Sequence, residues 1–464
     1  MTADRLSALD VSFLYLEEPT TPMHVGSVAV FKPPKAGLDH DRLIGLIERR
    51  LHLVPRYRQK IKWVPARLAS PVWVDDTAFD IAFHVRRSAL PRPGSDAQLC
   101  ELVGRLMSRR LDRSRPLWEI YLVEGLSGGR IAVITKTHHA MVDGIGAVDL
   151  AQVMLDQTPR PRSIPGDSWV AAPEPTAADL ALDAVSELVA QPSSAVDALR
   201  RSVDDVASSL GRLASQLAGA LAYARTAVAP SAETPLNATI GEQRRYGIAR
   251  TDLDDYKRVR KAHGGTVNDV VLATVAGGLR AWLMTRGEPV TAGLTIRAMV
   301  PVSVRPAAEP VGPGNHVSSY LVDLPVGEPD PLQRLRRISA EMSEHKADGQ
   351  SIGADVLVRL SGFAPPTLHS LAARAASQLS RRVFNVVVSN VPGPQLRLYA
   401  AGARMLEVFP VVPLAKGQAV SIGVTSYSGG LFYGLNADRD TMWDVDTLCQ
   451  LIRESLAELV ATVS

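Results

Sequence analysis

Two adjacent histidines stand at the end of an apolar segment in the first third of the chain. Residues 130–137 alternate like a β-strand, His138 and His139 follow, and Asp143 and Gly144 open the next segment. Junctions between a strand and a helix are where open α/β sheets place reactive groups. Because successive side chains of a strand point to opposite faces, we expect one histidine to point inward and the other toward a cleft, with one of them acting as a base.

The residue types at this junction suit proton transfer. An imidazole has a reference pKa of about 6.5, so it can take a proton from an attacking alcohol near neutral pH. Asp143 either accepts the imidazole Nδ1 proton or holds the loop through an arginine, and both roles orient rather than react. A single histidine is usually a packing residue, but two histidines, an aspartate and a glycine so close together rarely arise from packing alone.

Two other kinds of site fit parts of this sequence less well. Histidine and aspartate both bind metals, but a third ligand is missing, because His263 and His316 lie in the other half of the chain without paired carboxylates. The stretch 125–129 fits the G-x-S-x-G pattern of serine hydrolases around Ser127. That pattern requires a helix after the serine, whereas a second strand is predicted here, so a turn explains the glycines better.

The elements around these residues predict an α/β fold. The first part of the chain alternates between strands at 24–31, 118–123 and 130–137 and helices at 41–52 and 97–111. The second part continues with strands at 294–304, 316–324, 384–391, 404–411, 420–427 and 431–436, and with helices at 268–285, 331–345 and 445–460. We expect Thr266 to cap the helix that follows it and Arg286-Gly287 to end that helix.

The composition changes between the two parts. Residues 157–241 begin with clustered prolines, continue with an Ala-, Leu- and Ser-rich stretch of helical spacing, and end near Pro230 and Pro235. We therefore predict an N-terminal lobe at 1–156, a helical linker at 157–241 and a C-terminal lobe at 242–464. The acidic excess of the linker favours helices packed on the protein over helices that face lipid.

The overall composition excludes several classes of protein. The chain has 464 residues, with 51 Lys and Arg against 48 Asp and Glu, and this near balance disfavours a general nucleic-acid binder. Its two cysteines, Cys100 and Cys449, cannot staple a fold of this size and fit a reducing compartment. The N-terminus lacks the apolar core of a secretory signal, and the long uncharged run 417–437 resembles a hairpin. We expect a cytoplasmic protein, with any contact to the inner membrane or lipid bodies being peripheral.

Several spaced motifs together resemble one known family. The stretch His138-His139-Ala140-Met141-Val142-Asp143-Gly144 matches the H-H-x-x-x-D-G signature of the CoA-dependent acyltransferase superfamily. The remaining landmarks are similar to its bacterial wax ester synthase/diacylglycerol acyltransferase branch: Leu9-Asp10, Pro22–Val25, Pro116–Trp118, Thr266–Asp269, Met299–Arg305 and Asn385–Pro394. The resemblance runs nearly end to end and leaves out the linker.

This resemblance implies two chloramphenicol-acetyltransferase-like lobes joined by the linker, with a substrate tunnel between them. It implies that His139 is the general base, with His138, an orienting Asp143 and Gly144 completing the motif. It further implies transfer of a long-chain acyl group from acyl-CoA to diacylglycerol, a long-chain alcohol or both, with acyl-CoA as a substrate and with no covalently bound cofactor and no metal. The alternatives are a condensation-type enzyme acting on polyketide or peptide-derived acceptors, and a non-catalytic homologue that binds acyl-CoA or lipid droplets.

Other residues of the matched motifs are expected near the substrates. Pro116, Leu117 and Trp118 either line the acyl path or pack in the core. Asn268 is expected to donate to the oxyanion or to shape the site, while Asp269 and Arg305 supply charge, with Arg305 paired to Asp143 or to another acid. The basic residues Arg49, Arg50, Arg56, Arg58, Lys60 and Lys62 either meet the phosphates of CoA or form a solvated face.

Overall fold

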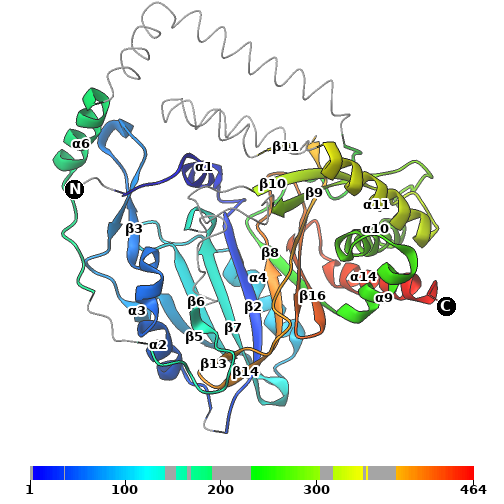
Figure 1. Cartoon of the computed structure of the whole chain (residues 1–464), viewed down its shortest axis with the longest axis horizontal. Helices are drawn as coiled ribbons and strands as arrows, with labels where there is room; N and C mark the ends of the chain where they lie inside the picture. The colour runs from blue at the N-terminus through cyan, green and yellow to red at the C-terminus, as the bar shows by residue number, and fades with distance from the viewer. Residues whose placement is uncertain are drawn as a thin grey trace, which may run out of the picture.

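Strands from both halves of the chain form two large sheets. The computed structural model describes residues 4–35, 37–141, 153–164, 169–190, 231–303, 317–348, 352–353 and 383–463. This part of the chain contains a six-stranded sheet beside a seven-stranded sheet, together with a small sheet near the N-terminus (Figure 1). The small sheet has the order β1 (Asp4–Arg5), β4 (Val72–Asp75), β3 (Gln59–Lys62).

The six-stranded sheet carries the two histidines. Its order is β13 (Tyr399–Ala400), β14 (Ala403–Val411), β2 (His24–Lys32), β7 (Arg130–His138), β6 (Trp118–Leu126), β5 (Val85–Ala89). Strands β2 and β7 are antiparallel, with His24 opposite His138. Strands β6 and β7 form the predicted hairpin, and Gly128 and Gly129 in its turn have positive φ, which glycine adopts without strain. Ser127 therefore lies in a hairpin turn, as expected, and not before a helix.

Helices pack around the first sheet and fix its edges. They are α1 (Ala8–Leu16), α2 (His40–Glu48), α3 (Ile81–His84) and α4 (Asp96–Met107). Helix α4 begins at a capping box formed by Ser95 and Gln98. At its other end the buried Lys136 of β7 donates to the carbonyls of Leu106, at 3.0 Å, and of Arg109. This lysine adds a side-chain donor to carbonyls at the end of the helix, and it ties α4 to the face of β7 on which His138 also lies.

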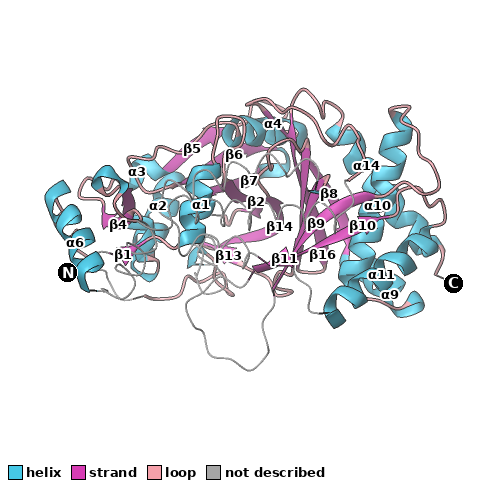
Figure 2. Ribbon diagram, turned by 90° about the horizontal axis from the view of Figure 1, so that it is seen from above, coloured by secondary structure: helices cyan, strands magenta, loops and turns pink. Residues whose placement is uncertain are grey.

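The seven-stranded sheet forms the core of the second half. Its order is β11 (Ile352–Gly353), β10 (Val317–Leu324), β9 (Ile296–Ser303), β12 (Val386–Val391), β15 (Val420–Tyr427), β16 (Gly430–Asp438), β8 (Arg244–Asp252). The helices of this half are α9 (Leu253–His263), α10 (Val267–Thr285), α11 (Pro331–Asp348) and α14 (Val445–Ala461). Figure 2 shows them gathered on the side of this sheet that faces away from the first. The strands β15 and β16 confirm that the uncharged run is a hairpin.

Helix α10 is the apolar centre of the second half. Its side chains from Val270 to Val275 are fully or almost fully buried, together with Trp282. By length and hydropathy α10 could cross a membrane. However, 72% of its most apolar stretch is buried inside the protein, as in the core helix of a globular protein. The predicted cap is confirmed, because the Thr266 side chain accepts from the Asp269 N–H at 3.2 Å.

One strand crosses the predicted boundary between the lobes. Residues of β14 belong to the second half of the chain, yet they pair with β2 of the first sheet, with Met405 opposite Phe31 and Val411 opposite Gly26. Strand β14 also contacts the second sheet, where Phe409 packs edge-on against Phe432 at 5.4 Å between ring centroids. Strand β14 is therefore hydrogen-bonded within the first sheet and packed through its side chains against the second, so it joins the two sheets.

The described part of the predicted linker packs on the first lobe. Helix α6 (Ala177–Ala190) buries Leu180 and Ala184 against Val64, Val72 and Val74 near the small sheet. Glu174 just before it pairs with Lys62 at 2.8 Å. This agrees with helices packed on the protein; residues 191–230 lie outside the described residues.

Candidate active site

Backbone hydrogen bonds hold the two histidines at the end of β7. The His138 N–H donates to the Leu117 carbonyl at 2.9 Å, and the His139 N–H donates to the Met23 carbonyl at 2.8 Å. A short 3-10 turn, His139–Met141, follows directly. Strand β7 is therefore hydrogen-bonded to its neighbours β2 and β6 as far as its last residue, His138, and His139 is the first residue beyond the strand.

The side chains of the two histidines have different surroundings, as their alternation along a strand predicts. The ring of His138 is 1% exposed and lies against Glu17 and His24. The ring of His139 stacks on Phe13 of α1, with 3.9 Å between the centroids and an interplanar angle of 26°. This stacking keeps the His139 ring nearly parallel to the Phe13 ring, which restricts the direction in which the imidazole nitrogens point.

Both imidazoles are neutral at physiological pH. Burial lowers the pKa of His139 to about 4, although a backbone hydrogen bond acts in the opposite sense. Burial lowers the pKa of His138 to about 3, against the attraction of the Glu17 carboxylate. A neutral imidazole has a free lone pair, so each ring is in the protonation state that a general base requires. Asp143 and Gly144 lie outside the described residues.

The Pro116–Trp118 segment is buried in the core beside β7. Trp118 stacks on His84 at 4.5 Å, and its indole N–H donates to the Tyr57 carbonyl at 2.7 Å. The Leu117 carbonyl accepts the His138 N–H, so the segment supports the histidine pair through its backbone. Of the two roles expected for this segment, these contacts favour packing.

The two second-lobe residues of the Thr266–Asp269 motif have different partners. The Asn268 Oδ1 accepts a hydrogen bond from Asn390 Nδ2 at 3.0 Å, which fixes the amide plane and leaves the Asn268 amide N–H groups for another acceptor. The Asp269 carboxylate accepts from the Thr266 N–H at 2.8 Å and from the Ser339 hydroxyl at 2.9 Å. Asp269 thus completes a capping box. Arg305 lies outside the described residues.

A cavity of about 920 Å³ lies between the two sheets. Apolar side chains line most of it, among them Phe31, Val133, Leu398, Met405 and Val408. It follows β2 from Phe31 to Gly26, and Gly26 pairs with Lys136, two residues before His138. Thr135 also lines the cavity. It precedes His139 by four residues, which in an extended strand is about 13 Å. The volume and lining suit an apolar chain that extends away from the histidine.

The far end of the cavity is polar. Asp156, Arg160 and Arg162 line it, and Asp156 forms an ion pair with the buried Arg50 at 2.8 Å. Other cations of the basic segment also have carboxylate partners: Arg56 with Asp4, Lys60 with Asp76 and Glu174, and Lys62 with Glu174. Their positive charge is largely neutralised within the protein, which weakens the idea that this segment binds the phosphates of CoA.

Three side chains near the histidines were missed by the sequence analysis. They are Phe13, which stacks on His139, Glu17, which lies beside His138, and Arg113, which pairs with Glu17. Glu17 and Arg113 are separated by 96 positions and belong to no shared motif, so only the fold brings them together. Among the described residues, no group of three His, Cys, Asp or Glu side chains is placed to hold a metal ion.

Comparisons with known proteins agree with this geometry. The family model described as "Wax ester synthase/diacylglycerol acyltransferase catalytic domain" matches residues 6–271, and "WS/DGAT C-terminal domain" matches residues 313–460. "Probable diacyglycerol O-acyltransferase tgs3" of Mycobacterium tuberculosis is 47% identical over 257 residues, which are 55% of this chain and 95% of that protein. "Probable diacyglycerol O-acyltransferase tgs1" of the same organism is 34% identical over 460 residues, 99% of this chain and 96% of its own.

Solved structures give the same picture of the fold. The wax ester synthase/diacylglycerol acyltransferase from Marinobacter aquaeolei VT8 is similar with a TM-score of 0.71 at 28% identity, covering 99% of both chains. The first condensation domain of the CDA synthetase is similar in fold alone, with a TM-score of 0.59 at 15% identity, covering 100% of this chain and 97% of that domain.

Proposed function

The chain belongs to the wax ester synthase/diacylglycerol acyltransferase family, and on that premise we propose that His139 is the general base of its acyl transfer. Members of this family transfer an acyl group from acyl-CoA to diacylglycerol or an alcohol, and this chain is an O-acyltransferase of that kind. The observation that carries the proposal is the placement of His139: its ring stacks on Phe13, its backbone N–H donates to the Met23 carbonyl, and it directly follows strand β7, which lines the apolar cavity.

The reaction requires one base and no covalent acyl-enzyme. The acceptor hydroxyl oxygen attacks the thioester carbonyl carbon while its proton moves to the His139 imidazole. The tetrahedral intermediate then collapses, the carbon–sulfur bond breaks, and the imidazolium returns the proton to the departing CoA sulfur. A positioned base of this kind is worth about 10²–10⁴ in rate.

The Asn268 amide is our proposed oxyanion donor. Its Oδ1 is engaged by Asn390, so its N–H groups are the part of the amide left to stabilise negative charge. A single such donor contributes about 10²–10³ in rate when it is aimed at the developing oxyanion. Asn268→Ala is expected to lower kcat by that factor.

The cavity is proposed to hold one of the two apolar chains. A long acyl or alkyl chain matches the lining of Phe31, Val133, Met405 and Val408, and the polar end at Arg160 and Arg162 limits how far an apolar chain extends.

Contact with a lipid surface is a further part of the proposal. Diacylglycerol and long-chain alcohols partition into membranes and lipid bodies, so the enzyme must approach such a surface. Trp63 and Leu68, 36% and 50% exposed, flank Arg67, whose guanidinium lies over the Trp63 ring. Flotation with phosphatidylcholine/diacylglycerol vesicles tests this, and loss of flotation is expected in Trp63→Ser/Leu68→Ser.

The activity is tested with purified protein, labelled palmitoyl-CoA and a panel of acceptors: diacylglycerol, hexadecanol and a carrier-bound peptide thioester. Triacylglycerol or wax ester above the level of a His139→Ala control is the expected result. Lipid ester formed equally by wild type and His139→Ala would contradict the role of His139. Binding of palmitoyl-CoA without any turnover would support a non-catalytic homologue.

A further inference from the structure

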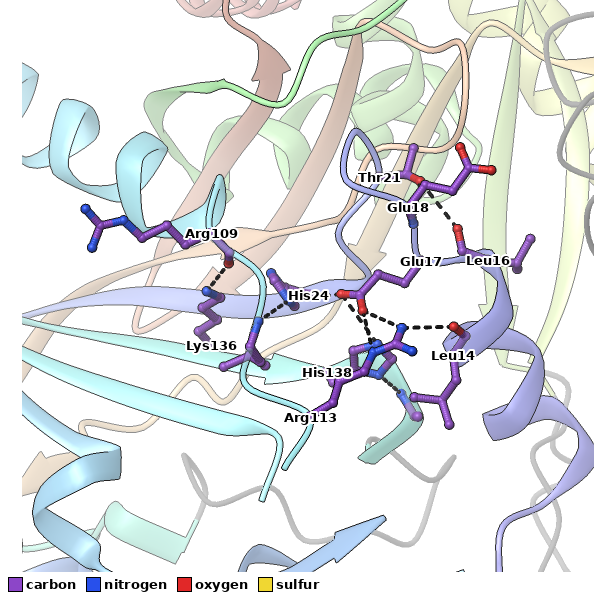
Figure 3. Close-up of polar contacts among 12 residues, drawn as sticks. Leu14, Leu16, Glu17, Glu18, Thr21, His24, Arg109, Arg113, Lys136 and His138 are labelled. Carbon is purple, nitrogen blue, oxygen red and sulfur yellow. Dashed lines mark hydrogen bonds and ion pairs between the residues drawn. The ribbon is translucent and has the colours of Figure 1, made fainter. Parts of the chain in front are cut away.

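A buried carboxylate lies where α1 meets the end of β7. Glu17, the residue that ends α1, is 1% exposed, and Figure 3 shows its side chain pointing toward His24, His138 and Arg113. One of its oxygens lies 3.8 Å from His138 Nε2 and 3.5 Å from His24 Nε2. The other accepts from Arg113 Nε at 2.9 Å. An ionised group at this depth is costly unless its neighbours compensate it, so the cluster requires an explanation.

Glu17 and Arg113 together close the C-terminal end of α1. The Glu17 N–H donates to the Phe13 carbonyl at 3.2 Å, and Arg113 Nη2 donates to the Leu14 carbonyl at 2.9 Å. These bonds satisfy carbonyls that the helix itself leaves free. Phe13, whose carbonyl takes part, is the residue whose ring stacks on His139.

The other side of Glu17 meets His138 in one defined tautomer. The Ala140 N–H donates to His138 Nδ1 at 3.0 Å, so Nδ1 carries the lone pair and the proton of the neutral ring is on Nε2. Nε2 and the nearby Glu17 oxygen are both buried, and among the described residues neither has a hydrogen-bond partner within ordinary distance. A donor and an acceptor thus face each other at 3.8 Å in the interior, and His24 Nε2, at 3.5 Å, is the other imidazole nitrogen beside this oxygen.

The charges of the cluster are consistent with this arrangement. Burial raises the pKa of Glu17, but the neighbouring imidazoles of His24 and His138 and the guanidinium of Arg113 outweigh it and lower the pKa to about 2. Burial lowers the pKa of His24 to about 4, with Lys136 acting in the same sense and Glu17 and Glu119 opposing. At neutral pH the cluster therefore consists of one carboxylate, one guanidinium and two neutral imidazoles.

We propose that Glu17 is a positioning residue for His139: it binds Arg113 at the end of α1 on one side and faces the Nε2–H of His138, 3.8 Å away, on the other, and so keeps Phe13 stacked on the His139 ring. The inference rests on the proposed role of His139. Helix α1 and the end of β7 are separate elements, and the Glu17 side chain contacts both.

The first test measures His138 directly, in the full-length protein labelled with ¹⁵N-histidine. The ten histidines are assigned with the help of His138→Asn. In wild type we expect His138 as the Nε2–H tautomer, with an Nε2 proton that exchanges slowly with water. Glu17→Ala should make that proton exchange fast, whereas Glu17→Gln, which keeps an acceptor oxygen, should retain most of the protection. An Nδ1–H tautomer in wild type would overturn the proposal.

The second test measures the rate for each folded molecule. Glu17→Ala is expected to lower kcat by up to about tenfold, the most that loss of the Phe13 contact would cost, with KM for palmitoyl-CoA changed less than about twofold, and Glu17→Gln should recover much of that loss. The matched control is Glu18→Gln, which removes a negative charge from the next residue, where Glu18 pairs with Lys416 on the surface. A Glu17→Ala enzyme that folds and retains wild-type kcat, or an equal loss in Glu18→Gln, would contradict the proposal.

The two tests separate this inference from the proposed function. If His139→Ala retains activity, the role of His139 fails, while the tautomer and exchange of His138 still report whether Glu17 holds that ring. If Glu17→Ala does not fold, wild type and Glu17→Gln alone decide the outcome through the same resonance.

Discussion

Burial gives the His139 imidazole a pKa of about 4, so protonation inactivates it at a lower pH than it would a solvent-exposed histidine. We expect kcat/KM to change less than about twofold between pH 8 and pH 5.5, and to fall as the pH approaches 4. An imidazole with the reference pKa of about 6.5 would lose about eightfold between pH 7 and pH 5.5. The measurement is initial rate with palmitoyl-CoA at subsaturating concentration across this range. An acid limb centred near 6.5 would show that the free enzyme exposes the ring to water.

At the residue scale, the sequence singled out the proposed base but not the side chains that surround it. His138 and His139 were singled out because their position after an apolar strand and before Asp143 is visible in the local order of residues. Phe13 was not, because an aromatic residue in an apolar helix looks the same in the sequence whether it packs against leucine or against an imidazole. Glu17 was missed for a related reason: two adjacent glutamates look like a solvated helix end, and only tertiary contacts show that one is buried while its neighbour is on the surface.

Helix α1 supports the site through one aromatic contact, and this gives a prediction at the scale of elements. Phe13→Ala removes the face that holds His139, and an aromatic pair of this geometry is worth about 0.5–1.5 kcal/mol. We expect kcat to fall by up to about tenfold with little change in KM, since the lost contact orients the base and does not touch the acceptor. Phe13→Tyr keeps the ring and serves as the control. If Phe13→Tyr loses as much as Phe13→Ala, the stacking is not what matters.

Most elements of the fold were predictable because their patterns are local. The 268–285 helix has its cap, apolar repeat and glycine stop in sequence, and the structure has α10 at Val267–Thr285. The 420–427 and 431–436 strands are joined by a short turn, so their pairing follows from proximity. Strand β14 was predicted as a strand, but its partner β2 lies more than 370 positions earlier in the chain, and no local pattern indicates which sheet it joins. The short strands β1 and β3 lack an alternating pattern and were not predicted.

The buried histidines make the stability of the whole molecule dependent on pH. His24 and His138 have pKa values of about 4 and about 3 in the folded chain, below the value of about 6.5 for an unfolded one. Between these values the unfolded state binds more protons, so the free energy of unfolding falls as the pH is lowered through 6.5. From pH 7 to pH 5 each histidine removes on the order of 2 kcal/mol.

Urea unfolding at pH 7, 6 and 5 measures this dependence. His138→Asn retains an acceptor for the Ala140 N–H while removing one titrating group, so its free energy of unfolding should fall less steeply over the same range. Equal slopes for wild type and His138→Asn would mean that His138 is not buried in its neutral form in solution.

The joining of the two sheets by β14 also predicts how the whole molecule selects its substrates. Ala29 on β2 lies opposite Val133 on β7 and Val408 on β14, and all three line the cavity between the sheets. Ala29→Phe should place a ring where a long chain would run. We expect kcat/KM to fall most for palmitoyl-CoA or hexadecanol and least for chains of about eight carbons, because each excluded methylene is worth about 1–3 kcal/mol.

Ala29→Ser keeps the side chain small and is the matched control for Ala29→Phe, with kcat/KM measured over series of acyl-CoA and alcohol lengths. A change confined to the acyl series would assign the cavity to the donor chain, and a change confined to the alcohol series would assign it to the acceptor. If Ala29→Phe lowers both series uniformly at every length, the cavity does not hold either chain. Strands β2, β7 and β14 of the six-stranded sheet form one wall of the cavity, and residues 391–394 and 425–427 from the second half of the chain also line it. A change confined to one series would therefore make selection by chain length depend on how the two halves of the molecule meet.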